Sequence, residues 1–148
     1  MKTTQARNPR DSGKLADLSR SVSERDCKLD AFKAPLGLSE VHLEIEHMTS
    51  LCPATGAEDF YSIDISYAPR GLCLETRSLK EYFASFRSVV VSAEVLADQI
   101  AQELLKASGA QWMKATVHQA VRGGIRIHAT AHLSVNDGEQ RPVQERNA

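Results

Sequence analysis

The stretch VHLEIEHMTSLCPATGAEDFYSIDISY, residues 41–67, decides the fold of this chain. Its first part alternates Val41, Leu43 and Ile45 with polar residues, and its last part alternates in the same way over residues 60–67. This period of two is typical of half-buried β-strands. Proline and glycine between the two runs are typical of a loop. The stretch therefore predicts two neighbouring strands joined by a loop that contains a cysteine.

The hydrophobic period changes to that of helices in the next part of the chain. Residues 78–87 place apolar side chains three and four positions apart, which gives one apolar helical face. Ser78 followed by Glu81 is the pattern of a capping box at the start of this helix. A second helix is expected between Ser92, as its N-terminal cap, and Gly109, which supplies the stop.

Two further alternating segments, residues 111–120 and 124–135, follow the helices and are joined by a turn in the sequence VRGG. The order strand, strand, helix, helix, strand, strand predicts an α+β fold, in which a four-stranded antiparallel sheet carries both helices on one face. Such a sheet has two open edges, which a chain can cover by pairing with copies of itself. The order of elements therefore also favours a ring-forming homo-oligomer.

Length, charge and composition restrict the class of protein. The chain has 148 residues, the natural size of one domain with a single core. Its formal net charge of −1 and aromatic content of 5% argue against nucleic acid or an anionic membrane surface as a partner. The N-terminus lacks the apolar core of a signal peptide, and no apolar run has the length of a membrane span. We therefore expect a cytoplasmic protein.

The two ends of the chain differ in composition from the middle. Residues 1–37 mix both charge signs with Ser, Pro and Gly and show no sustained hydrophobic period, which predicts a disordered N-terminal arm. Residues 136–148 are similarly polar and are predicted to form a loose C-terminal tail. The folded domain is therefore expected to span residues 38–135.

Cys52 and Asp59 are the candidate catalytic pair that the residues themselves indicate. Cys52 lies in the loop between the first two strands, and loops on a rigid frame commonly carry reactive groups. Asp59 stands seven residues further on, at the start of the second strand. A thiolate beside a protonatable carboxyl suits addition to an electrophilic carbon whose neighbouring atom must receive a proton. Taken alone, this spacing fits a small buried cysteine better, because free cysteines are among the most often buried residues.

The other cysteines and the histidines are expected to have structural roles. The three cysteines are odd in number and none is spaced as C-x-x-C, which argues against a disulfide framework or a zinc site. Packing is the expected role of Cys73. His128 and His132 lie four residues apart on one face of a predicted strand, too far apart to bind one ion without help from elsewhere. No metal site is predicted.

Three ordered motifs resemble a known family. The stretches SLCPATGAEDF (residues 50–60), CLETRSLKEYFASFR (73–87) and RGGIRI (122–127) are similar to the QueF-type nitrile reductases of queuosine biosynthesis, the 7-cyano-7-deazaguanine reductases. The resemblance covers about residues 40–134. It implies the tunnelling fold, in which an antiparallel sheet with two helices assembles into rings, with a small-molecule deazapurine as substrate and sites between subunits.

The resemblance also implies a role for each matching residue. Cys52 would attack the nitrile carbon to form a covalent thioimide, and Asp59 would donate the proton to nitrogen. NADPH would then deliver two hydrides in succession and give the aminomethyl product. The residues matched to substrate binding are Leu74, Glu75, Thr76 and Glu94. Those matched to NADPH binding are Thr76, Arg77, Arg122 and Gly123.

One departure from the family pattern bears on the function. The family has Phe-His-Glu before the second helix, where this chain has Ser92, Ala93 and Glu94. The glutamate is kept, but the histidine, a natural proton relay, is replaced by Ala93. Two alternatives to the reductase therefore stay open. One is an amidinotransferase-like relative that adds ammonia to the nitrile without nicotinamide chemistry, and the other is a non-catalytic module that binds a purine-like ring through Glu94.

Overall fold

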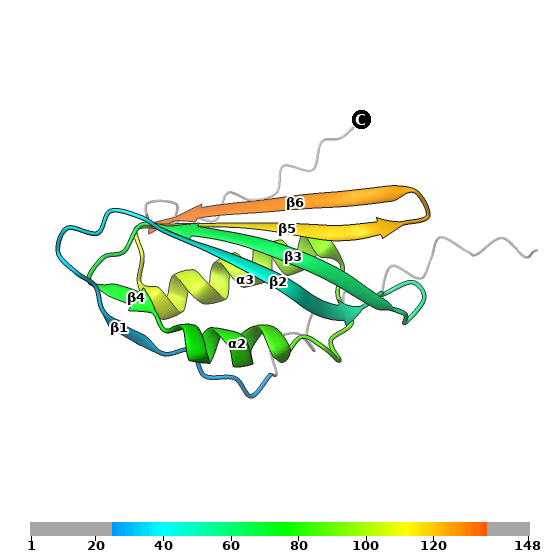
Figure 1. Cartoon of the computed structure of the whole chain (residues 1–148), viewed down its shortest axis with the longest axis horizontal. Helices are drawn as coiled ribbons and strands as arrows, with labels where there is room; N and C mark the ends of the chain where they lie inside the picture. Colours follow the sequence, from blue (N-terminus) through cyan, green and yellow to red (C-terminus); the bar gives the residue numbers. More distant parts are fainter. Residues whose placement is uncertain (1–24, 136–148) are drawn as a thin grey trace, which may run out of the picture.

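A four-stranded antiparallel sheet with two helices on one face forms the body of the protein (Figure 1). The computed structural model describes residues 25–135. The sheet has the order β2 (Val41–Leu51), β3 (Glu58–Tyr67), β5 (Trp112–Arg122) and β6 (Ile125–Ser134). The helices are α2 (Thr76–Ala84) and α3 (Ala93–Ser108). The predicted α+β class, sheet and helix placement are confirmed.

The core lies between the helices and the sheet face that they cover. On β3, Ile63 and Ile65 point toward the helices and are fully buried. The predicted apolar stripe of α3, formed by Leu96, Ile100 and Leu104, is also fully buried. Alternation with period two on the strand and spacing of four on the helix bring these side chains to the same interface. The two helices in the described part of the chain lack the length and apolar character needed to cross a bilayer.

A β-bulge in β2 determines which side of the sheet Cys52 faces. Val41, Leu43 and Ile45 point toward the helices, but the register with β3 shifts between Ile45 and Met48. His47 takes up the extra residue, with φ at 61°. Because a one-residue shift exchanges the two faces of a strand, the even-numbered residues after the bulge point inward. Cys52 is consequently buried on the helix side, and the sequence analysis missed this device.

The turn between β5 and β6 brings Arg122 to the same end of the sheet as Cys52. Arg122 pairs with Ile125, so Gly123 and Gly124 form a two-residue turn. Their φ values of 56° and 79° are those of a type I′ hairpin, which requires positive φ at both central positions. Glycine adopts this conformation without steric cost. The predicted hairpin turn is confirmed.

A second, two-stranded sheet corrects the predicted N-terminal arm. Strand β1 (Ala31–Lys33) pairs antiparallel with β4 (Leu72–Leu74). Upstream of β1, Cys27 is half-buried against the core, and the Arg25 guanidinium lies 3.5 Å from the centroid of the Phe86 ring. Backbone pairing and a cation–π contact hold this segment without a hydrophobic period. The arm interpretation is therefore wrong for residues 25–37, while residues 1–24 and the predicted tail, 136–148, lie outside the described residues.

The predicted caps are correct for α3 and wrong for the start of α2. Ser92 caps α3 through a hydrogen bond from the Val95 amide, and Gly109 ends the helix with φ at 60°, as expected. The capping box predicted at Ser78 and Glu81 is wrong. Instead, α2 begins earlier, and the Glu75 carboxylate accepts hydrogen bonds from the amides of Arg77 and Ser78 at 2.6 and 2.7 Å. These bonds, with Ser78 first, hold the pKa of Glu75 below its ordinary value.

The position of this cap can be tested by alanine substitution. Glu75→Ala leaves two amides at the helix start without their acceptor, so we expect the melting temperature to fall by roughly 2–6 °C. Glu81→Ala is the matched control within the same helix and should leave it almost unchanged. Thermal unfolding followed by circular dichroism measures both. Equal effects of the two substitutions would contradict the cap assignment.

Candidate active site

Cys52 lies at the end of β2, where the chain that leads into α3 runs alongside. The Leu51 amide donates to the Val89 carbonyl at 2.9 Å, and the Val91 amide donates to the Leu51 carbonyl at 3.1 Å. These two bonds hold the start of α3 beside the cysteine. They explain how the segment SVVV, which stands where the family pattern differs, still positions Ala93 and Glu94 at the site.

The loop after Cys52 is closed by its own backbone. The Cys52 amide donates to the Ala57 carbonyl and the Gly56 amide donates to the Cys52 carbonyl, both at 2.8 Å. Gly56 has φ at 71°, a conformation that glycine adopts without strain. The closed loop turns Thr55 and its backbone back toward the sulfur. The conformation of the loop thus places Thr55 beside the thiol.

The Cys52 thiol is buried and activated. Its residue is only 7% exposed. A hydrogen bond from the Thr55 side chain has the largest effect and lowers the pKa of Cys52. Burial raises this pKa. Hydrogen bonds from Arg122 and from the backbone of Thr55 and Ala54 lower it further. The net result lowers the pKa of Cys52 to about 7. About half of the thiol is therefore ionised at neutral pH, which is the reactive form of cysteine.

Arg122 joins Cys52 to Asp59. One guanidinium nitrogen donates to Cys52 Sγ at 3.3 Å, and the other forms an ion pair with Asp59 Oδ1. The Asp59 side chain is only 2% exposed, so its charge requires such a partner. The predicted catalytic pair is thus held at one guanidinium, and Arg122 itself contacts the thiol and the carboxylate.

A cavity of about 280 Å³ opens beside these groups. Four predicted residues line it: Cys52, Asp59, Glu94 and Arg122. Ala93 and Gln119 also line the wall, and Ala93 presents only a methyl group where the family pattern has an imidazole. The volume lies close to the lower limit of about 300 Å³ for small-molecule sites. The arrangement suits covalent addition of the thiol to a small planar ligand.

The other predicted binding residues do not reach this cavity within one chain. Leu74 is buried in β4, Glu75 caps α2, and Thr76 and Arg77 are exposed in the first turn of that helix. Figure 1 shows β4 and the start of α2 toward the end of the molecule opposite the β2–β3 loop. Gly123 lies in the β5–β6 turn next to Arg122. A single chain therefore carries two separate groups of predicted site residues.

Sequence reasoning missed two side chains at the site. Thr55 lies within the motif that drew attention to Cys52, and its hydroxyl has the largest lowering effect on the pKa of the thiol. Gln119 is a buried polar residue on the helix-facing side of β5, in line with Met113, Ala115 and Val117. A polar residue at an otherwise apolar inward position was the available signal.

Comparison with known proteins gives the family. The model of the QueF-like protein family matches residues 58–137. The chain belongs to the QueF-like family. A relative from Halorhodospira halophila, named NADPH-dependent 7-cyano-7-deazaguanine reductase, is 42% identical over 85 residues, which are 57% of this chain and 72% of the relative. A relative of the same name from Anaeromyxobacter sp. is 36% identical over 62% of this chain and 75% of its own length.

A solved structure of a QueF-like protein agrees with the fold. The crystal structure of the archaeosine synthase QueF-Like in the apo form superposes with a TM-score of 0.61 and is 26% identical. The match covers 68% of this chain and 95% of the other. The fold of this chain is therefore that of a QueF-like protein.

The role of Thr55 in this QueF-like site can be tested by removing its hydroxyl. Thr55→Val should raise the pKa of Cys52 from about 7 toward the ordinary value of 9.0. At pH 7 the thiolate fraction should then fall from about a half to roughly a tenth or less. The pH dependence of iodoacetamide alkylation, quantified on the Cys52 peptide, reports this midpoint. Thr49→Val is the control, and an unshifted midpoint in Thr55→Val would exclude the hydroxyl as the activating group.

Proposed function

We propose that the protein is a cytoplasmic enzyme that uses NADPH to reduce the nitrile of 7-cyano-7-deazaguanine to an aminomethyl group, a reaction of queuosine biosynthesis. The observation that carries this proposal is the activated thiol of Cys52, which shares Arg122 with the buried Asp59 at a cavity wall. The QueF-like family model matches residues 58–137, which include Asp59 and Arg122, and the names of the two curated relatives state this activity.

In the first step, the Cys52 sulfur bonds to the nitrile carbon and the nitrile nitrogen takes one proton. When Cys52 is a neutral thiol, Asp59 accepts its proton and passes it to the nitrogen, so the thioimide forms without a net proton change. When Cys52 is already a thiolate, the proton that Asp59 delivers to the nitrogen is taken up from water. Asp59 is suited to this relay because its carboxylate is buried and lies at the cavity. Arg122 stabilises the negative charge while it resides on sulfur or carboxylate.

Glu94 is proposed to orient the ring. A carboxylate accepts two hydrogen bonds at once, which matches the adjacent N–H groups of a guanine-like edge. It lines the cavity together with Cys52. The Ala93 side chain cannot relay a proton. We therefore assign proton transfer to Asp59 and ring binding to Glu94.

NADPH, when bound, would supply the two hydrides that convert the thioimide to the amine; two protons are taken up as well, and the C–S bond breaks so that Cys52 is released as a thiol. The phosphates of NADPH require cationic partners. Of the two arginines matched to NADPH binding, Arg77 is available for this role and Arg122 already has partners. Arg77 is exposed at the first turn of α2. Arg122 is engaged with Asp59 and Cys52, and Glu75 already accepts the amide hydrogens at the helix start. We propose Thr76 and Arg77 as the phosphate contacts, and Arg122 with Gly123 beside the reacting end.

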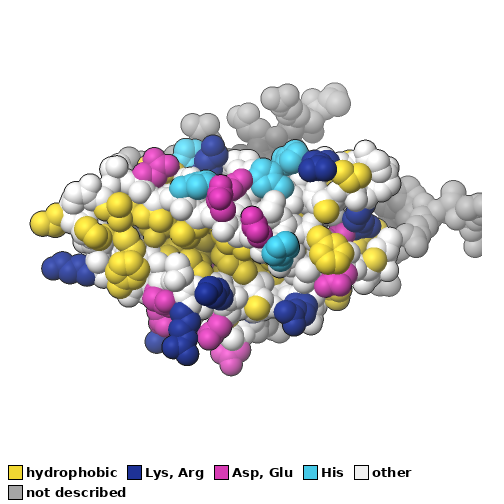
Figure 2. All heavy atoms as spheres, viewed as in Figure 1, with side chains coloured by type: hydrophobic (Ala, Val, Ile, Leu, Met, Phe, Trp, Pro, Cys, Tyr) yellow, Lys and Arg dark blue, Asp and Glu magenta, His cyan; other side chains and the backbone are white. Residues whose placement is uncertain are grey.

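We propose that the predicted domain, residues 38–135, extended by the segment 25–37 that contains β1, is a tunnelling-fold domain that assembles into a ring. Support comes from the two open edges of the sheet, β2 and β6, which invite pairing with another copy. An apolar groove of about 360 Å³ lies along the β2 edge between the sheet and α2 (Figure 2). Its apolar lining consists of Leu43, Ile45, Met48, Leu79, Phe83 and Ala84. Assembly would bring Leu74, Glu75, Thr76 and Arg77 of one copy to the Cys52 cavity of the next.

The reaction is tested by following NADPH absorbance and product mass with the nitrile as substrate. Reduction of a nitrile to an amine takes four electrons, so we expect two NADPH consumed for each amine formed. Asp59→Asn cannot relay the proton, and kcat/KM should fall by about 10² to 10⁴-fold while the fold is kept. Amidine formation from ammonia without NADPH consumption would assign the chain to the amidinotransferase type, and binding without turnover to a non-catalytic module.

Assembly of the site from two copies is tested by complementation. Cys52→Ala and Glu75→Gln chains should each be inactive alone. Mixed under dissociating conditions and reassembled, they should recover part of the wild-type activity, because some interfaces then combine an intact Cys52 with an intact Glu75. Sedimentation should show the same oligomer for all three samples. A mixture that stays inactive while forming mixed oligomers would place the whole site within one chain.

A further inference from the structure

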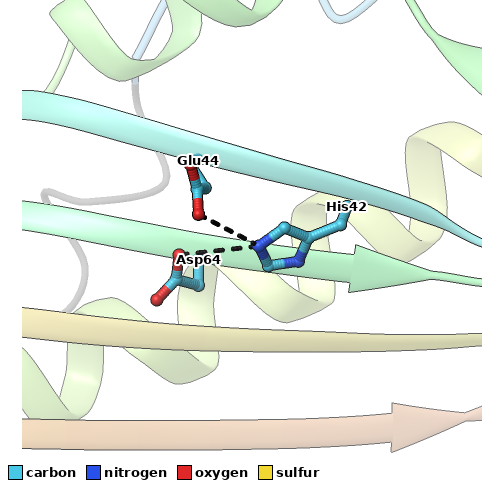
Figure 3. Close-up of side chains that lie close together, drawn as sticks. All are labelled: His42, Glu44 and Asp64. Carbon is cyan, nitrogen blue, oxygen red and sulfur yellow. Dashed lines mark ion pairs between the residues drawn. The ribbon is translucent and has the colours of Figure 1, made fainter.

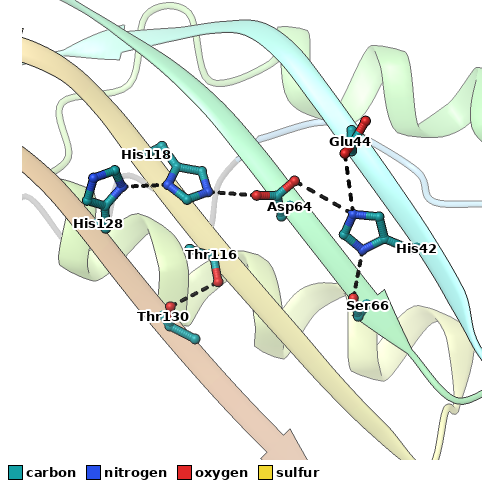
Figure 4. A network of polar contacts seen from close by, with 8 residues as sticks. All are labelled: His42, Glu44, Asp64, Ser66, Thr116, His118, His128 and Thr130. Atoms are coloured by element: carbon teal, nitrogen blue, oxygen red, sulfur yellow. Dashed lines mark hydrogen bonds and ion pairs between the residues drawn. The ribbon is translucent and has the colours of Figure 1, made fainter.

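The sheet face opposite the helices carries a row of polar side chains that crosses all four strands (Figure 4). Glu44 and His42 lie on β2, Asp64 on β3, His118 on β5 and His128 on β6. The proposed reductase site lies on the other face and uses none of these residues. Hence the row has no part in the chemistry described above.

Two carboxylates and an imidazole converge at one end of this row (Figure 3). Glu44 and Asp64 are direct cross-strand partners, and His42 stands two residues before Glu44 on the same face. His42 Nε2 lies 3.7 Å from Glu44 Oε1 and 3.7 Å from Asp64 Oδ1. One ligand atom from each of the three residues lies within 4.8 Å of the other two.

These separations are those of ligands around one metal ion. Metal–nitrogen and metal–oxygen bonds of about 2.0–2.2 Å place ligand atoms roughly 2.8–4.4 Å apart as the angle between the bonds opens from about 90° to about 180°. Both distances from His42 Nε2 fall inside this interval. The Glu44 side chain is 77% exposed, so it can rotate to close its distance to Asp64.

The two facing carboxylates also favour a cation between them. Like charges directly opposite each other on neighbouring strands are destabilising, and Glu44 and Asp64 form such a pair. A divalent ion between them would neutralise both carboxylates.

Neighbouring side chains orient two of the three ligands. His42 Nδ1 lies 2.8 Å from Ser66 Oγ, which directs the Nε2 lone pair toward the carboxylates. Asp64 Oδ2 accepts a hydrogen bond from His118 Nε2 at 2.7 Å, which directs Oδ1 toward His42. His118 is held in turn by His128, with the two Nδ1 atoms 2.6 Å apart. Such outer partners commonly orient metal ligands and increase affinity.

The ligand types indicate the class of metal. Imidazole favours first-row transition metals and zinc over magnesium and calcium, which prefer oxygen ligands throughout. Three protein ligands leave at least one position open. We propose that His42, Glu44 and Asp64 form a binding site for one divalent transition-metal ion, Zn²⁺ or Co²⁺. The bound ion links the edge strand β2 to β3 on the uncovered face of the sheet.

The test is a titration of the full chain with Co²⁺, followed by visible absorption and by the melting temperature. We expect one equivalent to bind and to raise the melting temperature, because the ion binds the folded state only. His42→Ala and Asp64→Asn should each weaken binding by at least about tenfold, and His118→Ala by about tenfold. His132→Ala is the matched control, a histidine on the same face of β6 outside the row, and should bind as the wild type does.

A second variant separates this site from the active site. Cys52→Ala should bind Co²⁺ as tightly as the wild type and give the same absorption spectrum, because the thiol lies on the other face of the sheet. Loss of binding in Cys52→Ala, or equal affinity in His42→Ala and His132→Ala, would overturn the proposal. A wild-type chain that binds no Co²⁺ would also overturn it. None of these outcomes depends on nitrile reduction.

Discussion

The contact of one guanidinium with a thiol and a carboxylate is the interaction on which the site depends. Arg122 reaches Cys52 and Asp59 from a different hairpin, so it joins the β2–β3 loop to the β5–β6 turn. Without Arg122, Asp59 would be a buried charge without its ion-pair partner, and the thiol would lose one of its stabilising hydrogen bonds. The residue that the family pattern matches to cofactor binding is therefore also a direct neighbour of the Cys52 thiol.

The bulge in β2 turns Cys52 to the side of the sheet where Arg122 can contact it. Without the register shift near His47, the alternation that starts at Val41 would direct Cys52 to the open face of the sheet. Instead, Cys52, Asp59 and Gln119 all point toward the helix side at one end of the molecule. The opposite face is left to the polar row that ends at His42 and Glu44. One irregularity thus places the Cys52 thiol and the polar row on opposite faces of the sheet.

Much of this organisation could be predicted from the sequence, and the failures have physical reasons. Strong periodicity predicted the four long strands and both helices, because a half-buried element must place its apolar side chains regularly. The short β1 and β4 have no such period, since three residues cannot express one. The cap of α2 was misplaced because Ser78 and Glu81 match a local pattern, whereas the helix begins where β4 ends. Thr55 was overlooked because its effect depends on the closed loop and not on its spacing from Cys52.

The central claim is that Cys52 is a nucleophile toward an electron-poor carbon, and it can be measured without any cofactor. Intact-mass spectrometry of the chain after incubation with 7-cyano-7-deazaguanine, with NADPH omitted, reports covalent addition directly. The account predicts a gain of one substrate mass, located on the Cys52 peptide and reversed by an excess of small thiol. An unchanged mass under conditions where the ring binds, or an adduct on Cys27 or Cys73, would contradict it.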